Sequence, residues 1–204
     1  MRPPPRKTMT SLRSDVKMAN NELIVSKEEL KATYERATAG DAEAQYRLGK
    51  HLVALEPDEL AEDDPTEDEK KTMARVKEFT AELIEQRDGN SWILQAAEHG
   101  HARAMTNHAC RLFQRGDKAG GMKWLEKAGA KGDGQAMWFL AVRYAQASED
   151  NRENPFKRLI MLFTGDKNRS AAIEWYKKTI SDGDDENYKK MARSNLKRLT
   201  GQEE

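Results

Sequence analysis

Residues Trp124–Tyr144 read WLEKAGAKGDGQAMWFLAVRY, and two helical patterns meet at Gly132. Counted from Gly132, small or apolar residues stand eight and four positions before it and four, eight, nine and twelve positions after it. In a helix, positions at this spacing lie on one face. A glycine can end a helix with a positive φ at little cost, and Asp133 suits the start of the next helix. The stretch therefore predicts a helix, a tight turn at Gly132 and a second helix.

The same template returns when it is moved to three other glycines, Gly40, Gly100 and Gly183. The copy at Gly100 is good, the copy at Gly40 is partial, and the copy at Gly183 degenerates near the C-terminus. Self-similar helix-turn-helix units indicate a solenoid-like array, in which each unit buries its apolar face against its neighbours. Trp92, Trp124 and Trp175 share one template position. We expect these three indoles to be buried between successive helix pairs.

The motifs AGDAEAQYRLG at residues 39–49 and WILQAAEHG at residues 92–100 resemble the Sel-one-like repeat family, an α/α relative of the tetratricopeptide repeats. The resemblance covers residues 26–199. It implies an all-α, short superhelical repeat array, here with two helical insertions at about residues 56–88 and 148–168. It also implies a protein-binding role, because the family mostly scaffolds or regulates other proteins. Some small bacterial relatives are immunity proteins that neutralise a co-encoded toxin.

The expected domain organisation has three parts. Residues 1–25 are polar and lack periodicity, so we expect them to be disordered, with Met1, Met9 and Met18 as candidate starts. Residues 26–199 form the repeat domain, which begins at the capping box of Ser26 and Glu29. Residues 200–204 form a tail. The predicted helices are 26–39, 41–53, 65–86, 90–99, 101–113, 119–131, 133–147, 155–164, 169–181 and 184–199. Residues 148–154 belong to the second insertion.

Composition excludes several classes of protein. The 204 residues carry 35 Lys or Arg and 35 Asp or Glu, so the net charge gives no bulk attraction to nucleic acid or to a membrane. The single cysteine, Cys110, cannot form a disulfide within the chain and favours a reducing compartment. No apolar run approaches membrane-spanning length and no secretory pattern begins the chain. We expect a cytoplasmic protein.

The sequence contains no recognisable catalytic or phosphate-binding motif and no two-histidine zinc helix. His99, His101, His108 and Cys110 cluster in sequence, but His101 and His108 stand about 10 Å apart along a helix, too far to share one metal ion. His108 also takes the place of Leu48 and Leu140 in the template, which indicates a core position. We therefore expect no cofactor, no metal site and no enzyme activity.

The predicted binding site is a concave groove lined by the first helix of each unit. Trp138 and Tyr46 share a template position opposite the small-residue stripe, so we expect them to face the groove, unless an inserted helix covers it. An aromatic residue flanked by charges is typical of a binding hot spot. The predicted partner-binding residues are Tyr46, Arg47, Lys50, Arg103, Asn107, Trp138 and Arg143.

Two further stretches have alternative interpretations. The acidic run at residues 56–69 is either a solvated loop or a site for a basic partner. The apolar run at residues 159–163 either packs on the edge of the array or docks a partner.

The leading functional hypothesis is a non-catalytic adaptor, regulatory or immunity protein that binds a partner protein, such as a co-encoded toxin or a signalling protein. The alternative is an enzyme or small-ligand-binding protein with a pocket roofed by the inserted helices.

Overall fold

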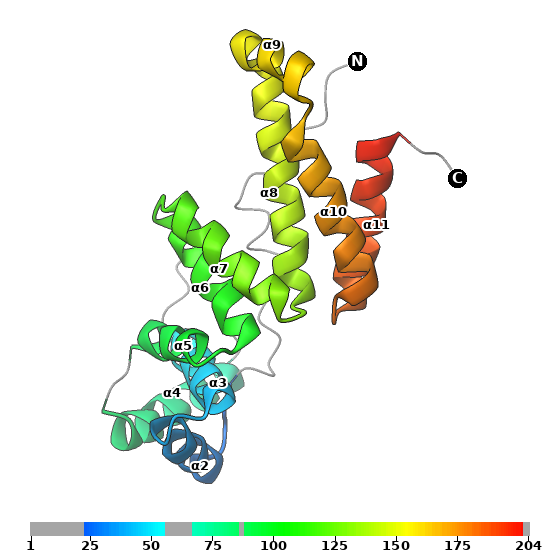
Figure 1. Ribbon diagram of the computed structural model, residues 1–204. Helices are drawn as coiled ribbons and strands as arrows, with labels where there is room; N and C mark the ends of the chain where they lie inside the picture. The colour runs from blue at the N-terminus through cyan, green and yellow to red at the C-terminus, as the bar shows by residue number, and fades with distance from the viewer. Residues whose placement is uncertain (1–22, 56–66, 86–87, 202–204) are drawn as a thin grey trace. The chain divides into compact units, whose positions relative to one another are not determined.

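The computed structural model describes residues 23–55, 67–85 and 88–201. These residues form α-helices joined by short turns, with no strand in the described ranges (Figure 1). The expectation of an all-α protein is confirmed. The chain divides into two compact units, residues 1–92 and residues 93–204, each of which is described separately below.

The first unit holds α2 (Lys27–Thr38), α3 (Ala42–Ala54), α4 (Glu67–Leu83) and the beginning of α5 (Gly89–Glu98). Ser26 caps α2, and its side chain accepts a hydrogen bond from the Glu29 amide, as the capping box predicts. The helices enclose one apolar core. Its larger buried members are Ile24, Leu30, Leu48, Leu52, Val76, Phe79, Ile84 and Trp92.

The structure changes one sequence prediction in this unit and confirms another. Ile24 belongs to the stretch predicted to be disordered, yet it is buried in the core and its amide donates to His51. The helix predicted over residues 65–86 is present as α4, with its apolar residues Val76 and Phe79 buried. The first two residues of that predicted helix, most of the acidic run and the N-terminal residues 1–22 lie outside the described residues.

The second unit continues with α6 (Ala102–Gln114), α7 (Lys118–Ala130), α8 (Gly134–Glu153), α9 (Pro155–Thr164), α10 (Lys167–Asp182) and α11 (Glu186–Thr200). Helices α6 and α7 pack as a pair, α7 also contacts α8, α8 and α10 pack along each other, and α11 covers α10 and part of α8. Helix α9 contacts α8 and lies at the end of the α8–α10 pair (Figure 1).

Four corners of the chain share one hydrogen-bonded turn. Gly40, Gly100, Gly116 and Gly132 all have φ near +90°, between 88° and 94°. At each corner the amide after the glycine donates to the carbonyl five residues earlier, which closes the end of the preceding helix. The side chain of that following residue then caps the next helix. The capping residues are Asp41, His101, Asp117 and Asp133.

The prediction of an equivalent corner at Gly183 is wrong. Its φ of −61° and ψ of 146° are extended, and glycine is required there by close packing instead. A Cβ on Gly183 would lie 2.5 Å from the Thr179 carbonyl oxygen and 3.3 Å from Cα of Gly134. The Asp184 carboxylate accepts a hydrogen bond from the Gly134 amide at 2.9 Å, which joins the end of α10 to the start of α8.

The end predicted for the preceding helix, at about residue 147, is also wrong, because α8 continues to Glu153. Ser148 is buried and donates to Asp166, the N-cap of α10. Arg152 pairs with the same carboxylate at 3.3 Å. Burial alone would raise the pKa of Asp166, but the hydrogen bonds from Ser148 and from the Arg169 amide, together with Arg152, hold it below its usual value. These tertiary contacts stabilise a helical extension that its own polar sequence does not specify.

Candidate functional site

Trp138, the predicted anchor of the groove, is buried, with 7% of its surface exposed. Its ring lies 5.8 Å from the ring of Tyr188 on α11 and 5.3 Å from that of Phe139, measured between centroids. The terminal helix therefore covers Trp138, whereas the sequence analysis considered only an inserted helix for that position. Trp138 has no surface to offer a partner, and the expectation that it faces an open groove is not met.

The surroundings of Trp138 are polar at several points. Its indole Nε1 is buried without a hydrogen-bond partner. Burial raises the pKa of Cys110 to about 11 and that of Tyr188 to about 12, so both stay protonated at neutral pH. Asp133 is buried as the cap of α8, and its carboxylate accepts from the Ala136 amide and from Thr106. A protonated thiol is a poor nucleophile, so Cys110 is not poised for catalysis. Cys110, Asp133 and Tyr188 instead take part in the packing of α6, α8 and α11.

The other predicted site residues of the second unit have structural partners. Arg103 lies 3.5 Å from Asp184. The Arg143 guanidinium stacks over the ring of Phe113, with 4.4 Å between Cζ and the ring centroid. Asn107 is half-buried on α6 and also makes an interaction within the structure.

Three predicted site residues belong to the first unit. Arg47 is exposed on α3 and pairs with Glu29 of α2. Tyr46 and Lys50 are half-buried on the same helix and both interact with neighbouring groups. The structure thus places each of these residues on α3, and their role in partner binding stays a prediction.

The three tryptophans that share a template position differ in burial. Trp92 is buried beside Tyr34, with ring centroids 6.2 Å apart, as predicted. Trp175 is half-buried next to Gly129, where a Cβ would lie 3.2 Å from its ring. Trp124 is half-buried as well, so the prediction that all three are core residues is wrong for two of them. The template identifies the position of each indole on its helix, but the neighbouring helices decide how much of it is covered.

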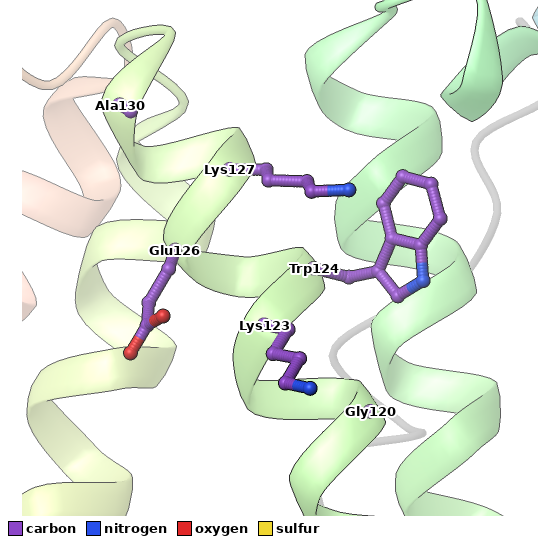
Figure 2. A pocket seen from close by; sticks show the side chains of 6 residues that line it. All are labelled: Gly120, Lys123, Trp124, Glu126, Lys127 and Ala130. Atoms are coloured by element: carbon purple, nitrogen blue, oxygen red, sulfur yellow. The ribbon is translucent and has the colours of Figure 1, made fainter.

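Trp124 borders a hollow of about 480 Å³ on the outer side of α7. Its wall consists of α7 residues only: Gly120, Lys123, Trp124, Glu126, Lys127 and Ala130 (Figure 2). The ring of His108 on α6 meets the indole edge to face at 5.3 Å, and the Lys127 ammonium lies 4.4 Å from the indole centroid. His108 is therefore half-buried against Trp124 and does not occupy the core position expected from the template.

Helix α9 exposes an apolar face. Phe156, Leu159 and Ile160 are 73%, 54% and 47% exposed. Asn154 caps the helix by accepting hydrogen bonds from the amides of Phe156 and Lys157, and Pro155 occupies its first turn. Of the two interpretations of the run at residues 159–163, packing on the rest of the molecule does not account for Leu159 and Ile160, and the side chains of residues 162 and 163 lie outside the described ones.

A second hollow, of about 310 Å³, lies at the turn between α9 and α10 and is lined by residues such as Asp166, Ser170 and Glu174. The enzyme or small-ligand hypothesis predicts a pocket beneath an inserted helix, and this hollow lies next to α9. The Asp166 carboxylate, however, is already bound by Ser148, Arg152 and the Arg169 amide. It is held as an ionised structural group and is not poised for proton transfer.

The histidines have individual structural roles. His101 uses Nδ1 to accept the Ala104 amide at 3.0 Å, in place of the aspartate found at the other corners. Within the described ranges, no group of three His, Cys, Asp or Glu side chains is arranged to hold a metal ion.

The sequence analysis did not single out His51, which is completely buried in the first unit. Its Nδ1 accepts the Ile24 amide at 3.2 Å and its Nε2 lies 3.0 Å from the Thr80 hydroxyl. Because Nδ1 is an acceptor, the ring proton of the neutral tautomer is on Nε2 and is donated to Thr80. The template gives no signal for this position, since Arg111 and Arg143 stand at the same offset from their glycines.

Comparison of the chain with family models, with curated proteins and with solved structures found no match. Among the described helices, none combines the length and the apolar character that crossing a membrane requires.

Proposed function

We propose that the chain is a helical-repeat protein of the Sel-one-like type that binds a partner protein and has no catalytic role. The repeat proposal is supported by the four glycine corners, which use the same backbone hydrogen bonds and the same side-chain cap at widely separated positions. Recurrence of one corner is what an array of similar helix pairs requires.

The observation that carries the binding proposal is the outward apolar face of α9. Three large apolar side chains, Phe156, Leu159 and Ile160, stand exposed within two turns of one helix. Scattered apolar residues are normal on a protein surface, but a contiguous group of this kind marks an interaction site. Buried against a partner, each of these side chains would contribute about 1–2 kcal/mol.

The placement of α9 supports the same proposal. The helix is capped at both ends, by Asn154 and by Gly165, so it is formed without a partner. A preformed helix loses little conformational entropy on binding. A partner with an apolar groove could receive this face as an amphipathic helix is received in other protein pairs.

The test is affinity capture with the full chain as bait, from an extract of the source organism, followed by mass spectrometry. The variant Phe156→Ser/Leu159→Ser/Ile160→Ser removes the apolar face, and Met191→Ser is the matched control because Met191 is an isolated exposed apolar residue on α11. We expect wild type and the control to capture the same partner protein. A co-encoded toxin or a signalling protein is the first candidate. The triple variant should lose this partner while its thermal midpoint stays the same. Equal capture by all three baits would refute the proposal.

A further inference from the structure

The hollow beside Trp124 has a second property that the binding role of α9 does not use: its charge. Lys123 and Lys127 line it, and neither forms an ion pair with any described residue. Arg111 and Arg115 of α6 lie near enough to His108 to act with burial in lowering the pKa of that imidazole. Two lysines thus border one half-exposed indole, and two arginines lie near its neighbour His108.

Among the described residues, the carboxylates near the hollow are directed to other groups or lie at its edge. Glu126 lines it, but its side chain points away from Trp124 and Lys127 (Figure 2) and interacts with Tyr144 on α8. Asp117 caps α7 by accepting the Gly120 amide at 2.8 Å. Glu98, at the end of α5, lies near enough to His108 to act on its imidazole. The chain as a whole has a formal charge of zero, so the positive charge here is a local feature.

The indole itself is held in place. His108 packs edge to face against it, and Lys127 lies over its ring. A half-exposed tryptophan bordered by cations is a residue combination found at binding hot spots. Because residues of one helix line the hollow, it is an open surface site along which a bound segment could lie.

We propose that the Trp124 hollow binds an acidic segment of another protein, with an apolar side chain against the indole and carboxylates paired with Lys123 and Lys127. A single helix forms the wall, so the segment lies along α7 and its carboxylates meet lysines spaced by about one turn. Such exposed pairs contribute modestly one by one, and the apolar contact with Trp124 supplies the rest of the affinity.

Nucleic acid is the competing occupant, since bases stack on tryptophan and phosphates bind lysine. The overall charge favours the peptide. A protein that binds single strands tracks the backbone with an extended positive groove, whereas this chain has a sequence pI of about 6.9 and its cations gather around one hollow.

The test is NMR titration of the full-length, ¹⁵N-labelled protein with defined probes. The acidic probe is a capped decapeptide of alternating Glu and Leu, and the control probe has Lys in place of Glu. A ten-nucleotide single-stranded RNA is the third probe. We expect saturable binding of the acidic probe alone, with the Trp124 indole N–H signal moving more than those of Trp92, Trp138 and Trp175.

Two charge-reversal variants make the result specific. Lys123→Glu/Lys127→Glu should weaken binding of the acidic probe at least tenfold. Lys177→Glu/Lys190→Glu changes the total charge equally on exposed positions of α10 and α11 and should leave the affinity within twofold of wild type. The proposal is overturned if the acidic probe shows no saturable binding, or if both variants weaken its binding equally. It is also overturned if the RNA binds more tightly than the acidic probe. The triple serine variant of α9 should bind the probe as wild type does, so this proposal and that for α9 fail independently.

Discussion

Single side chains decide which aromatic residues of this protein are structural and which are available for binding. Trp138 and Trp124 lie on neighbouring helices, but Tyr188 of α11 covers Trp138 while Trp124 has a hollow beside it. The sequence predicts the opposite, because Trp124 shares its template position with the buried Trp92. Tertiary packing has reversed the roles of the two indoles.

The difference in burial between Trp138 and Trp124 predicts how much each contributes to the stability of the protein. Trp138→Ala should lower the free energy of unfolding by about 3–5 kcal/mol, the usual cost of emptying a buried tryptophan site. Trp124→Ala should cost less, roughly 1–2 kcal/mol, because part of the indole is already in water. Urea denaturation followed by circular dichroism measures both.

Trp138→Phe is the informative companion variant. It keeps most of the ring contact with Tyr188 and removes the indole N–H that has no partner. An unpaired buried N–H donor is itself unfavourable. Trp138→Phe should therefore lower the free energy of unfolding clearly less than Trp138→Ala does. A larger loss for Trp124→Ala than for Trp138→Ala would contradict the burial described here.

At the scale of the helices, the corner is the recurring element. Gly132 has φ of +92° and no atom within 4 Å of a Cβ built on it, so space is available there and backbone conformation is the constraint. Gly40 and Gly116 share both properties. Gly183, in contrast, is constrained by space and not by φ.

Gly132→Ala should therefore destabilise the protein by about 1–2 kcal/mol, the cost of a left-handed conformation for a residue with a Cβ. Gly132→Asn should cost less, because asparagine enters that region more readily than alanine. The change in urea midpoint tests both substitutions. Equal losses for alanine and asparagine would show that something other than backbone conformation is at work.

At the scale of the whole molecule, the first unit should lose stability in acid. His51 in the first unit has its pKa lowered from 6.5 to about 4, mainly by burial and further by the positive charge of Arg47. The unfolded chain therefore takes up the proton at a higher pH than the folded unit does. The stabilisation is complete above about pH 6.5 and decreases as the pH falls towards 4.

We expect the first unit to lose up to about 3 kcal/mol of stability over this range, the equivalent of the shift in pKa. Urea titrations at pH 7 and pH 4.5, followed through the amide signals of Ile24 and Thr80, measure the loss. His51→Gln supplies the control, since it removes the titrating ring. If the control loses as much stability on acidification as wild type does, the effect does not come from His51.

The all-α class and most helix boundaries could be predicted from the sequence because their causes are local. Capping side chains, corner glycines and helical spacing act within a few residues, and Ser26, Gly40, Gly100 and Gly132 do in the structure what their sequence context predicts. The helical extension of α8 could not be predicted this way, since Ser148 and Arg152 are held by Asp166 after an intervening helix.

The candidate sites depended on tertiary structure even more. The sequence by itself determined where each helix begins and which of its faces is apolar, because those properties follow from neighbours along the chain. Only the folded chain decided that α11 covers Trp138, that α9 keeps its apolar face exposed and that Trp124 borders a basic hollow. Exposure is a property of which helices meet, and helices that meet are distant in sequence.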